Sequence, residues 1–371
     1  MTAPLFSPMT LRGLTTSNRI VVSPMCQYSA CDGSATDWHL MHYGQFAVSG
    51  AGLVIIEATH VEARGRITEG CLGLYSDENE AALRRVVALC REHGSSRIGM
   101  QLSHAGRKGS ACLPWENRGR PLAAEAGAWE TVAASPVPHD EGWPAPREMT
   151  GEDLEAVIQA HVQAVRRAAR LGIDLIEVHI AHGYLLHGFL SPLANRRTDA
   201  FGGSLANRMA FPLAVFRAMR GAWPDDRPMG VRLSVQDWVE GGWSVEDSVV
   251  FGRELAALGC DYLTASSGGV SPRQQIELGE GHQVEFAHRL KRETGLPTMA
   301  VGMIFDPHFA NELISQRKSD FVALARGMLH DPHWSWAAAA ALGAEVSHPP
   351  QYVRSYRSAW LRRQRALPQF H

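Results

Sequence analysis

Short apolar runs rich in Val and Ile recur along the chain, and stretches with helical periodicity separate them. We interpret the runs as eight strands, at residues 19–25, 52–59, 97–103, 174–180, 229–234, 262–267, 298–302 and 321–326. Their nearly continuous apolar character is typical of parallel strands that are covered on both faces. Eight strand–helix units predict an α/β fold, a (β/α)8 TIM barrel, rather than an open doubly wound sheet.

Helix boundaries are readable in the stretches between the runs. Residues 78–94 and 152–172 carry apolar positions at helical spacing. Thr150 and Asp153 have the spacing of an N-terminal capping pair, and Gly172 is placed as a C-terminal stop. We therefore expect a long helix from about residue 151 to just before Gly172.

Two segments depart from the alternation. Residues 1–18 read as a short N-terminal hairpin that could plug the bottom of the barrel. Residues 105–149, rich in proline and containing Trp115, Trp129 and Trp143, form a long capping insertion after the third strand. Loops of this length inside a compact domain are usually functional, so we expect a lid. We interpret residues 1–371 as a single barrel domain carrying these additions.

The charge balance and the cysteine spacing limit the classes of binding partner and the cellular compartment that we expect. The 36 Lys and Arg residues against 38 Asp and Glu residues give a formal charge of −2, so there is no basic surface for nucleic acid or an anionic membrane. We expect a small-molecule partner. The six cysteines lack C-x-x-C spacing, and no signal-peptide pattern or long apolar run occurs. These features predict a soluble, cytoplasmic protein with reduced thiols.

Active sites of TIM barrels lie at the carboxyl ends of the strands. There the seventh and eighth strands deliver Gly302 and Arg326, at the place where barrels often bind phosphate, and we expect a phosphate-bearing cofactor. Gln101 can both donate and accept hydrogen bonds, which suits the edge of a planar heterocycle. Arg232 beside it would stabilise an anionic reduced ring. Taken singly, Gly302 and Arg326 could equally be a turn and a surface arginine, and Gln101 a buried structural amide.

The stretch 178–192, "VHIAHGYLLHGFLSP", places His179, His182 and His187 within nine residues. One alternative is therefore a metal-dependent barrel hydrolase with His179, His182, His104 and Cys26 as ligands. Such a site requires Asp or Glu beside the imidazoles and H-x-H or H-E-x-x-H spacing. "HIAHGY" provides neither, so we expect no metal.

Several stretches together resemble a known family: "NRIVVSPMCQYS", "GRITEGCLGLYSDE", "QLSHAGRK", "HIAHGYLLHGFLSPLANRRTDAFGGSLANR", "SSGG", "AVGMI" and "LARGMLHDPHW". Over nearly all its length the chain resembles the old yellow enzyme family of FMN-dependent ene reductases. It is most similar to the bacterial branch with xenobiotic reductase A and the thermophilic-like enzymes. Position 325 is Ala where relatives often have Gly, and "AVGMI" lacks a tryptophan found in xenobiotic reductase A.

The resemblance implies roles for individual residues. His179 and His182 would hydrogen-bond the activating group of the substrate, Tyr28 would line the same pocket, and Tyr184 would donate the proton. Cys26 would modulate the flavin potential, and His187 is left as structural. The residues that would hold FMN are Ser23, Pro24, Met25, Cys26, Ala58, Gln101, Arg232, Ser267, Gly268, Gly302, Met303, Ala325 and Arg326.

The resemblance also implies a reaction. NADPH, or alternatively NADH, reduces FMN, which passes hydride to the β-carbon of α,β-unsaturated carbonyl or nitro compounds such as enones and maleimides, with ping-pong kinetics. A C-terminal arm, residues 345–371, would bring Trp360 to a neighbouring subunit's site in a homodimer or homotetramer.

Two further alternatives remain. A non-catalytic flavin-storage protein would not need Tyr184 and both histidines. An iron–sulfur relative similar to 2,4-dienoyl-CoA reductase would need a cysteine cluster, and no cysteine follows Cys260.

Overall fold

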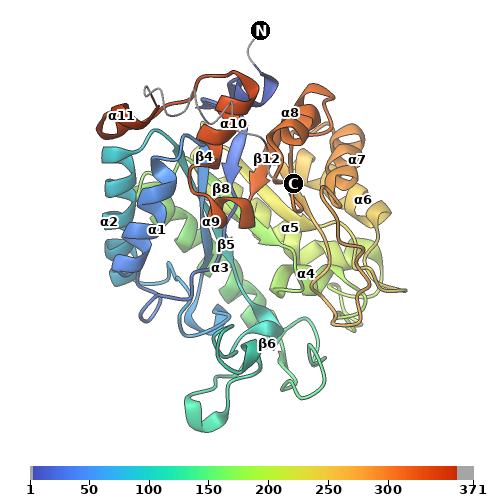
Figure 1. Cartoon of the computed structure of the whole chain (residues 1–371). Coiled ribbons are helices and arrows are strands. Elements are labelled where there is room, and N and C mark those ends of the chain that lie inside the picture. The colour runs from blue at the N-terminus through green and yellow to red at the C-terminus, as the bar shows by residue number, and fades with distance from the viewer. Residues whose placement is uncertain (1–2, 357–371) are drawn as a thin grey trace.

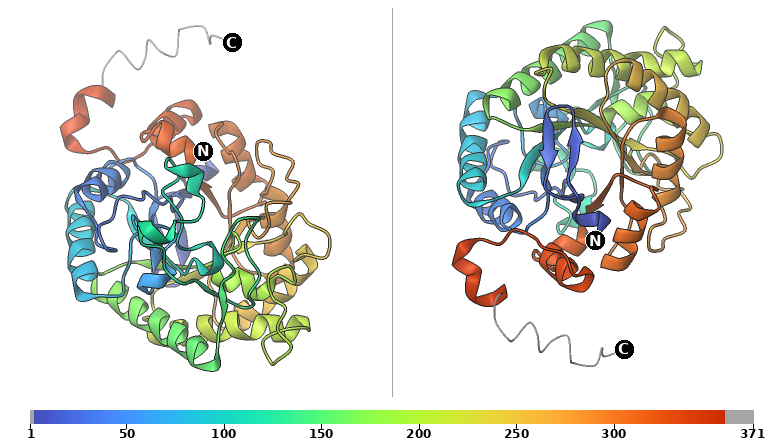
Figure 2. Two further views of the ribbon diagram at one scale, coloured as in Figure 1. Left: turned by 90° about the horizontal axis from the view of Figure 1, so that it is seen from below. Right: turned by 90° about the horizontal axis from the view of Figure 1, so that it is seen from above.

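The computed structural model describes residues 3–356, and its centre is a closed barrel of eight parallel strands (Figures 1 and 2). Each strand pairs in parallel with the next along the chain, and the last pairs with the first. The strands are β3 (Ile20–Val22), β4 (Leu53–His60), β5 (Arg97–Ser103), β8 (Leu175–Ile180), β9 (Met229–Ser234), β10 (Leu263–Ser266), β11 (Thr298–Ala300) and β12 (Phe321–Leu324). All eight lie within or overlap the predicted runs, so the predicted (β/α)8 barrel is confirmed.

Helices form a ring around the barrel, which Figure 2 shows in both views. The longer ones are α1 (Asp37–Ala47), α2 (Asp77–His93), α3 (Gly151–Arg170), α5 (Leu205–Ala222), α6 (Val245–Ala257), α7 (Val284–Thr294), α8 (Pro307–Ser315) and α10 (Trp334–Leu342). Three short helices accompany them: α4 (Leu185–Leu190), α9 (Arg326–His330) and α11 (Val353–Tyr356). Short α4 follows β8 directly, so its first turn lies at the carboxyl end of the barrel.

The boundaries of α3 are those that the sequence predicts. Thr150 accepts a hydrogen bond from the Asp153 N–H, and the Asp153 carboxylate accepts one from the Thr150 N–H. This capping box satisfies two N–H groups that the first turn of a helix leaves free. Gly172, just beyond the helix, has a φ of +77°, which glycine adopts without strain.

A hairpin closes one end of the barrel. Strands β1 (Met9–Leu11) and β2 (Leu14–Thr16) pair antiparallel and lie across the barrel in the right-hand view of Figure 2. Leu11 and Leu14 join an apolar cluster that fills the barrel interior, together with Val21, Leu53, Ile55, Leu175, Tyr262, Met299, Val301, Phe321 and Ala323. Between the strands of the hairpin, Arg12 donates to the Asp261 carboxylate at 2.5 Å. The interior is therefore packed, and the open end is the one where the strands finish.

The insertion at 105–149 lies at that open end, at the bottom of Figure 1 and opposite the hairpin. It contains three 3-10 turns, η3 (Gly106–Lys108), η4 (Asn117–Gly119) and η5 (Ala124–Ala126). Two very short parallel strands follow, β6 (Val132–Ala133) and β7 (Arg147–Glu148). Most of the insertion is irregular, as its proline content predicts.

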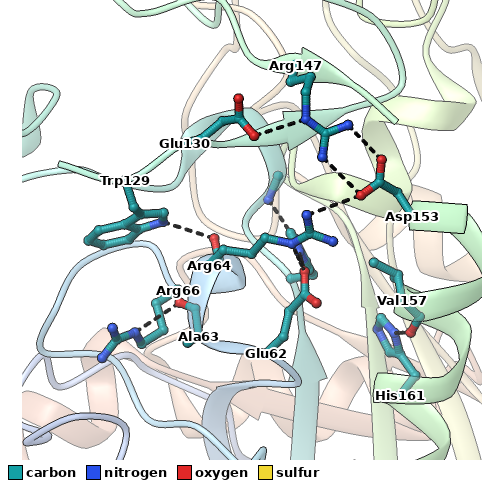
Figure 3. A network of polar contacts seen from close by, with 12 residues as sticks. Glu62, Ala63, Arg64, Arg66, Trp129, Glu130, Arg147, Asp153, Val157 and His161 are labelled. Carbon is teal, nitrogen blue, oxygen red and sulfur yellow. Dashed lines mark hydrogen bonds and ion pairs between the residues drawn. The ribbon is translucent and has the colours of Figure 1, made fainter. Parts of the chain in front are cut away.

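Charged side chains fix the base of this lid to the barrel (Figure 3). Arg147 donates to Glu130 at 2.9 Å and to both oxygens of Asp153, at 2.7 and 3.0 Å. Arg64, after β4, also donates to Asp153, at 3.2 Å, and its carbonyl accepts the Trp129 indole N–H at 3.0 Å. Several ion pairs that share Asp153 stabilise a structure more than isolated surface pairs do. The base of the lid is therefore fixed to the barrel.

Two observations complete the fold. Trp360 and most of the expected C-terminal arm lie outside the described residues. Within residues 3–356, none of the helices combines the length and the apolar character needed to cross a membrane.

Candidate active site

Two cavities open at the carboxyl end of the barrel. The inner cavity, about 210 Å³, lies between the ends of β10, β11 and β12. The outer cavity, about 580 Å³, lies under the lid. Seven residues predicted to hold a cofactor line the inner cavity: Ser23, Arg232, Ser267, Gly302, Met303, Ala325 and Arg326. The remaining cofactor candidates lie on or just after β3, β4, β5 and β10.

The backbone shapes the inner cavity at the end of β11. Gly302 has a φ of +118°, and a Cβ at this position would lie 3.0 Å from Gln283 Nε2 and 3.1 Å from the His282 ring. Met303 follows with a φ of +53°, a left-handed conformation that is unusual for its residue type. Strained backbone of this kind concentrates where chains hold ligands. This turn forms a cradle that a side chain at 302 would fill.

The loop after β10 provides the opposite wall. The Ser267 hydroxyl donates to the Gln283 side-chain oxygen at 3.0 Å, and Gln283 is a cavity residue that the sequence did not single out. The Gly268 N–H donates to the Gln236 carbonyl at 2.8 Å. Because this N–H is already paired, Gly268 contributes its left-handed conformation, with a φ of +68°, rather than a free donor.

The buried carboxylate of Glu177, on β8, links side chains of β5 and β10. Gln101 Nε2 donates to Glu177 Oε1 at 2.7 Å, and the Thr264 hydroxyl donates to Glu177 Oε2 at 2.6 Å. Burial raises the pKa of Glu177, although the nearby Arg232 charge opposes that rise. Sequence reasoning missed Glu177, and its signal was a carboxylate inside the apolar run "DLIEVHI". By accepting the Nε2 hydrogen bond, the Glu177 carboxylate fixes the orientation of the Gln101 side-chain amide.

Arg232 supplies the positive charge of the inner cavity. Its Nε is buried and has no hydrogen-bond partner among residues 3–356. Burial lowers the pKa of the guanidinium, and the nearby Glu177 carboxylate opposes this. An arginine is always charged, so a buried donor without a partner needs an acceptor. A flavin ring with acceptor atoms along its edge meets that need, and a phosphate chain suits the cradle at Gly302. The residues present therefore fit FMN.

The segment after β3, residues 23–26, carries four of the predicted cofactor residues. Pro24, Met25 and Cys26 are half-buried, and Ala58 is buried on the adjacent strand β4. Burial raises the pKa of the Cys26 thiol, and Cys71 and Glu57 raise it further, so Cys26 is a neutral thiol.

Glu57 anchors that segment from β4. Its carboxylate accepts the Gln27 backbone N–H at 2.8 Å and the Tyr43 hydroxyl at 3.0 Å. Burial raises its pKa to about 8.

The two histidines lie together at the end of β8. Their ring centroids are 5.0 Å apart, and burial followed by the Arg232 charge lowers both pKa values, so both rings are neutral. The Ala181 N–H donates to His179 Nδ1, which leaves the proton on Nε2, 3.3 Å from His182 Nδ1. His182 Nε2 in turn donates to the Ser266 hydroxyl at 2.7 Å. Both predicted donors thus have protein partners, which a substrate oxygen would have to replace.

Tyr184 caps α4 next to the histidines. Its ring centroid is 5.1 Å from that of His179 and 6.5 Å from that of His182. Burial raises the pKa of its hydroxyl, with Cys26 and Tyr28 adding to the effect, so it is a neutral proton-bearing group. The structure brings together all three residues that the resemblance assigns to catalysis.

Tyr28 lies where the outer cavity begins. It has a φ of +51°, and its ring meets the exposed Trp115 of the lid edge to face, with centroids 6.0 Å apart. Burial, and then Cys26, raise the pKa of its hydroxyl. Lys108 lines the same cavity, and its Nζ lies 5.1 Å from the centroid of the Tyr184 ring. Sequence reasoning assigned Lys108 no role, although it belongs to the quoted stretch "QLSHAGRK".

The ring of His187, which the sequence analysis left as structural, contacts two neighbouring segments of the fold. Its Nδ1 accepts the Gly183 N–H at 2.8 Å, and its Nε2 lies 3.0 Å from the buried Asp237 carboxylate. Burial acts to raise the pKa of Asp237, but the His187 and Ser191 contacts outweigh it and lower the pKa. His187 thus ties α4 to the loop after β9.

The residues of the alternative metal site can be checked for the clustering that a metal ion requires. Across residues 3–356, no three His, Cys, Asp or Glu side chains are grouped in a way that could hold a metal ion. His104 is committed elsewhere, since Nδ1 accepts the Gly106 N–H and Nε2 pairs with Glu62 at 2.7 Å.

Comparison with known sequences gives consistent matches. The family model described as "NADH:flavin oxidoreductase / NADH oxidase family" matches residues 4–344. An NADPH dehydrogenase of Geobacillus thermodenitrificans (strain NG80-2) is 43% identical over 359 residues, covering 96% of this chain and 100% of the relative. An NADPH dehydrogenase of Bacillus subtilis (strain 168) is 38% identical over 358 residues, with the same coverage.

Solved structures agree with the sequence relatives. Morphinone reductase superposes with a TM-score of 0.75 at 27% identity, covering 95% of this chain and 93% of that chain. Its structure in complex with tetrahydroNAD gives a TM-score of 0.73 at 26% identity, with 94% and 93% covered.

Proposed function

Since the chain belongs to the NADH:flavin oxidoreductase / NADH oxidase family, and is thus a flavin-dependent oxidoreductase, we propose that its reaction is ene reduction. NADPH, or NADH in its place, is the reductant, and an α,β-unsaturated carbonyl or nitro compound is the substrate. The proposal rests chiefly on the meeting of His179, His182 and Tyr184 just beyond the carboxyl end of β8, with ring centroids 5.0 to 6.5 Å apart.

FMN, when bound, supplies hydride exchange with the nicotinamide and with the β-carbon of the alkene. The chain positions that chemistry. Gln101 and Arg232 would bind the edge of the ring, and the turn at Gly302 would bind the phosphate. Reductant and alkene occupy the same cavity in turn, and ping-pong kinetics follow.

His179 and His182 bind the activating oxygen of the substrate. Negative charge builds on that oxygen during hydride addition, and neutral imidazole N–H groups stabilise it as an oxyanion hole does. Such donors contribute about 3 kcal/mol each to the transition state. In this arrangement the substrate oxygen replaces Ser266 and the other imidazole as acceptor.

Tyr184 completes the reaction by donating its hydroxyl proton to the α-carbon. Its raised pKa keeps the proton in place until a carbanion-like carbon forms beside it.

Turnover of the purified protein with NADPH tests the proposal. Cyclohexenone, N-phenylmaleimide and a nitroalkene are the substrates, and the saturated products are measured under anaerobic conditions. We expect product equal to the NADPH consumed for at least one substrate. A flavoprotein that oxidises NADPH only with oxygen as acceptor would contradict ene reduction.

We also propose that residues 345–371 form an arm that brings Trp360 to a neighbouring subunit in a homodimer or homotetramer. Sedimentation equilibrium of the whole chain and of a chain ending at residue 344 tests this. A monomeric whole chain would contradict it.

A further inference from the structure

We propose that Lys108 is a positioning residue for proton transfer: its ammonium holds the turn that carries His182 and Tyr184, and its charge stabilises the tyrosinate left behind when Tyr184 gives up its proton. This rests on the proposed role of Tyr184. Among the described residues the Lys108 ammonium hydrogen-bonds to backbone carbonyls and not to a histidine ring, so it acts through the turn and through the phenol ring.

The ammonium bridges two loops. Lys108 ends η3, and its Nζ donates to the His182 carbonyl at 2.9 Å and to the Gly269 carbonyl at 3.1 Å. The first carbonyl belongs to the loop after β8 and the second to the loop after β10. One half-buried cation therefore ties together three segments, which follow β5, β8 and β10.

These two loops meet backbone to backbone. His182 has a φ of +58°, which is strained for a histidine, and Gly183 and Gly269 have φ values of +73° and +92°. A Cβ on Gly183 would lie 2.3 Å from the Gly269 carbonyl oxygen, and one on Gly269 would lie 2.4 Å from His182 Cα. Two carbonyl oxygens brought together in this way repel each other, and a shared ammonium removes that repulsion.

The same ammonium faces Tyr184. Lys108 Nζ lies 5.1 Å from the centroid of the Tyr184 ring. A cation over the face of a phenol stabilises the neutral ring modestly and the phenolate much more, because the phenolate carries a full negative charge. The positive charge therefore favours the state of Tyr184 that follows proton donation.

The groups around Lys108 give it no carboxylate partner among the described residues. Arg107 is adjacent, and its guanidinium is held by the carbonyls of Val137, Pro138 and Val270. His139 of the lid and both site histidines sense the lysine charge, which contributes to lowering their pKa values. Burial, and then Arg107, lower the pKa of Lys108 to about 8. Lys108 is therefore charged below about pH 8 and loses its charge as the pH rises through that value.

Stopped-flow measurement of the two half-reactions tests this inference. Lys108→Met keeps the length and removes the charge, Lys108→Arg keeps the charge, and Lys318→Met is the matched control, because Lys318 pairs with Glu285 on the surface. We expect reoxidation by cyclohexenone to slow about tenfold or more in Lys108→Met, with a smaller effect on reduction by NADPH. Lys318→Met should match the wild type in both.

The pH profile separates a charge effect from a packing effect. Wild-type reoxidation should fall above about pH 8, the fall should disappear in Lys108→Met, and it should move to higher pH in Lys108→Arg. A fall near pH 8 that persists unchanged in Lys108→Met would overturn the inference. If Lys108→Met fails to retain flavin, the Lys108→Arg profile decides on its own.

A double mutant distinguishes this inference from the proposed function. If Lys108 acts through Tyr184, then Lys108→Met should slow a Tyr184→Phe enzyme much less than it slows the wild type. Equal slowing in both backgrounds would overturn the inference while leaving Tyr184 as the donor. Unchanged reoxidation in Tyr184→Phe alone would instead contradict the proposed function.

Discussion

The inner cavity and the turn at residues 182–184 are built in opposite ways. Around the inner cavity, glycine and left-handed backbone shape the wall, as at Gly302 and Met303. At the turn, the strained backbone orients side chains, and the half-buried Lys108 donates to the His182 carbonyl. If the first region binds its cofactor as proposed, its shape comes from the main chain and its charge from Arg232, so we expect it to tolerate changes that keep both. The second works through particular rings and charges, which substitution removes.

The largest effect should come from the side-chain region. We expect His179→Ala combined with His182→Ala to lower turnover of cyclohexenone by about 10³-fold or more, because two oxyanion donors are lost. FMN should remain bound, since neither ring lines the inner cavity. A double variant of the exposed His93 and His308 provides the control. Loss of the flavin from the site variant, or undiminished turnover, would count against the assignment.

A smaller effect is expected in the backbone region. Gly302→Ala forces a φ of +118° on a residue with a Cβ and crowds Gln283, so we expect a loss of stability of about 1–3 kcal/mol and weaker FMN binding. Ala325→Gly is the matched change, and it should cost less than about 1 kcal/mol because only the main chain matters there. Thermal unfolding and flavin fluorescence titration measure both. A larger loss of stability or of FMN affinity in Ala325→Gly than in Gly302→Ala would contradict the importance of the backbone conformation at Gly302.

The barrel could be predicted because its strands are buried on both faces and leave apolar runs such as the one at 52–59. The boundaries of α3 could be predicted for a local reason, since Thr150 and Asp153 contact each other within one turn. The lid could be predicted only as an irregular insertion. Its anchoring by Arg64, Glu130 and Arg147 depends on contacts between distant segments.

The site was predictable only in part, for the same reason. Gln101 and Arg232 stand at strand ends, where the fold itself assigns them a place. Glu177 and Lys108 were missed because their significance lies in partners far along the chain: Thr264 for the carboxylate, and Gly269 for the ammonium. The pairing of His182 with Ser266 likewise depends on the closure of the barrel.

Anaerobic stopped-flow kinetics of Tyr184→Phe test whether Tyr184 protonates the substrate. The variant keeps the ring and loses only the proton that the account assigns to the α-carbon. We expect reduction by NADPH at close to the wild-type rate and reoxidation by cyclohexenone slowed about 10²-fold or more. Reoxidation at the wild-type rate, or equal slowing of both half-reactions, would contradict the role of Tyr184 as proton donor.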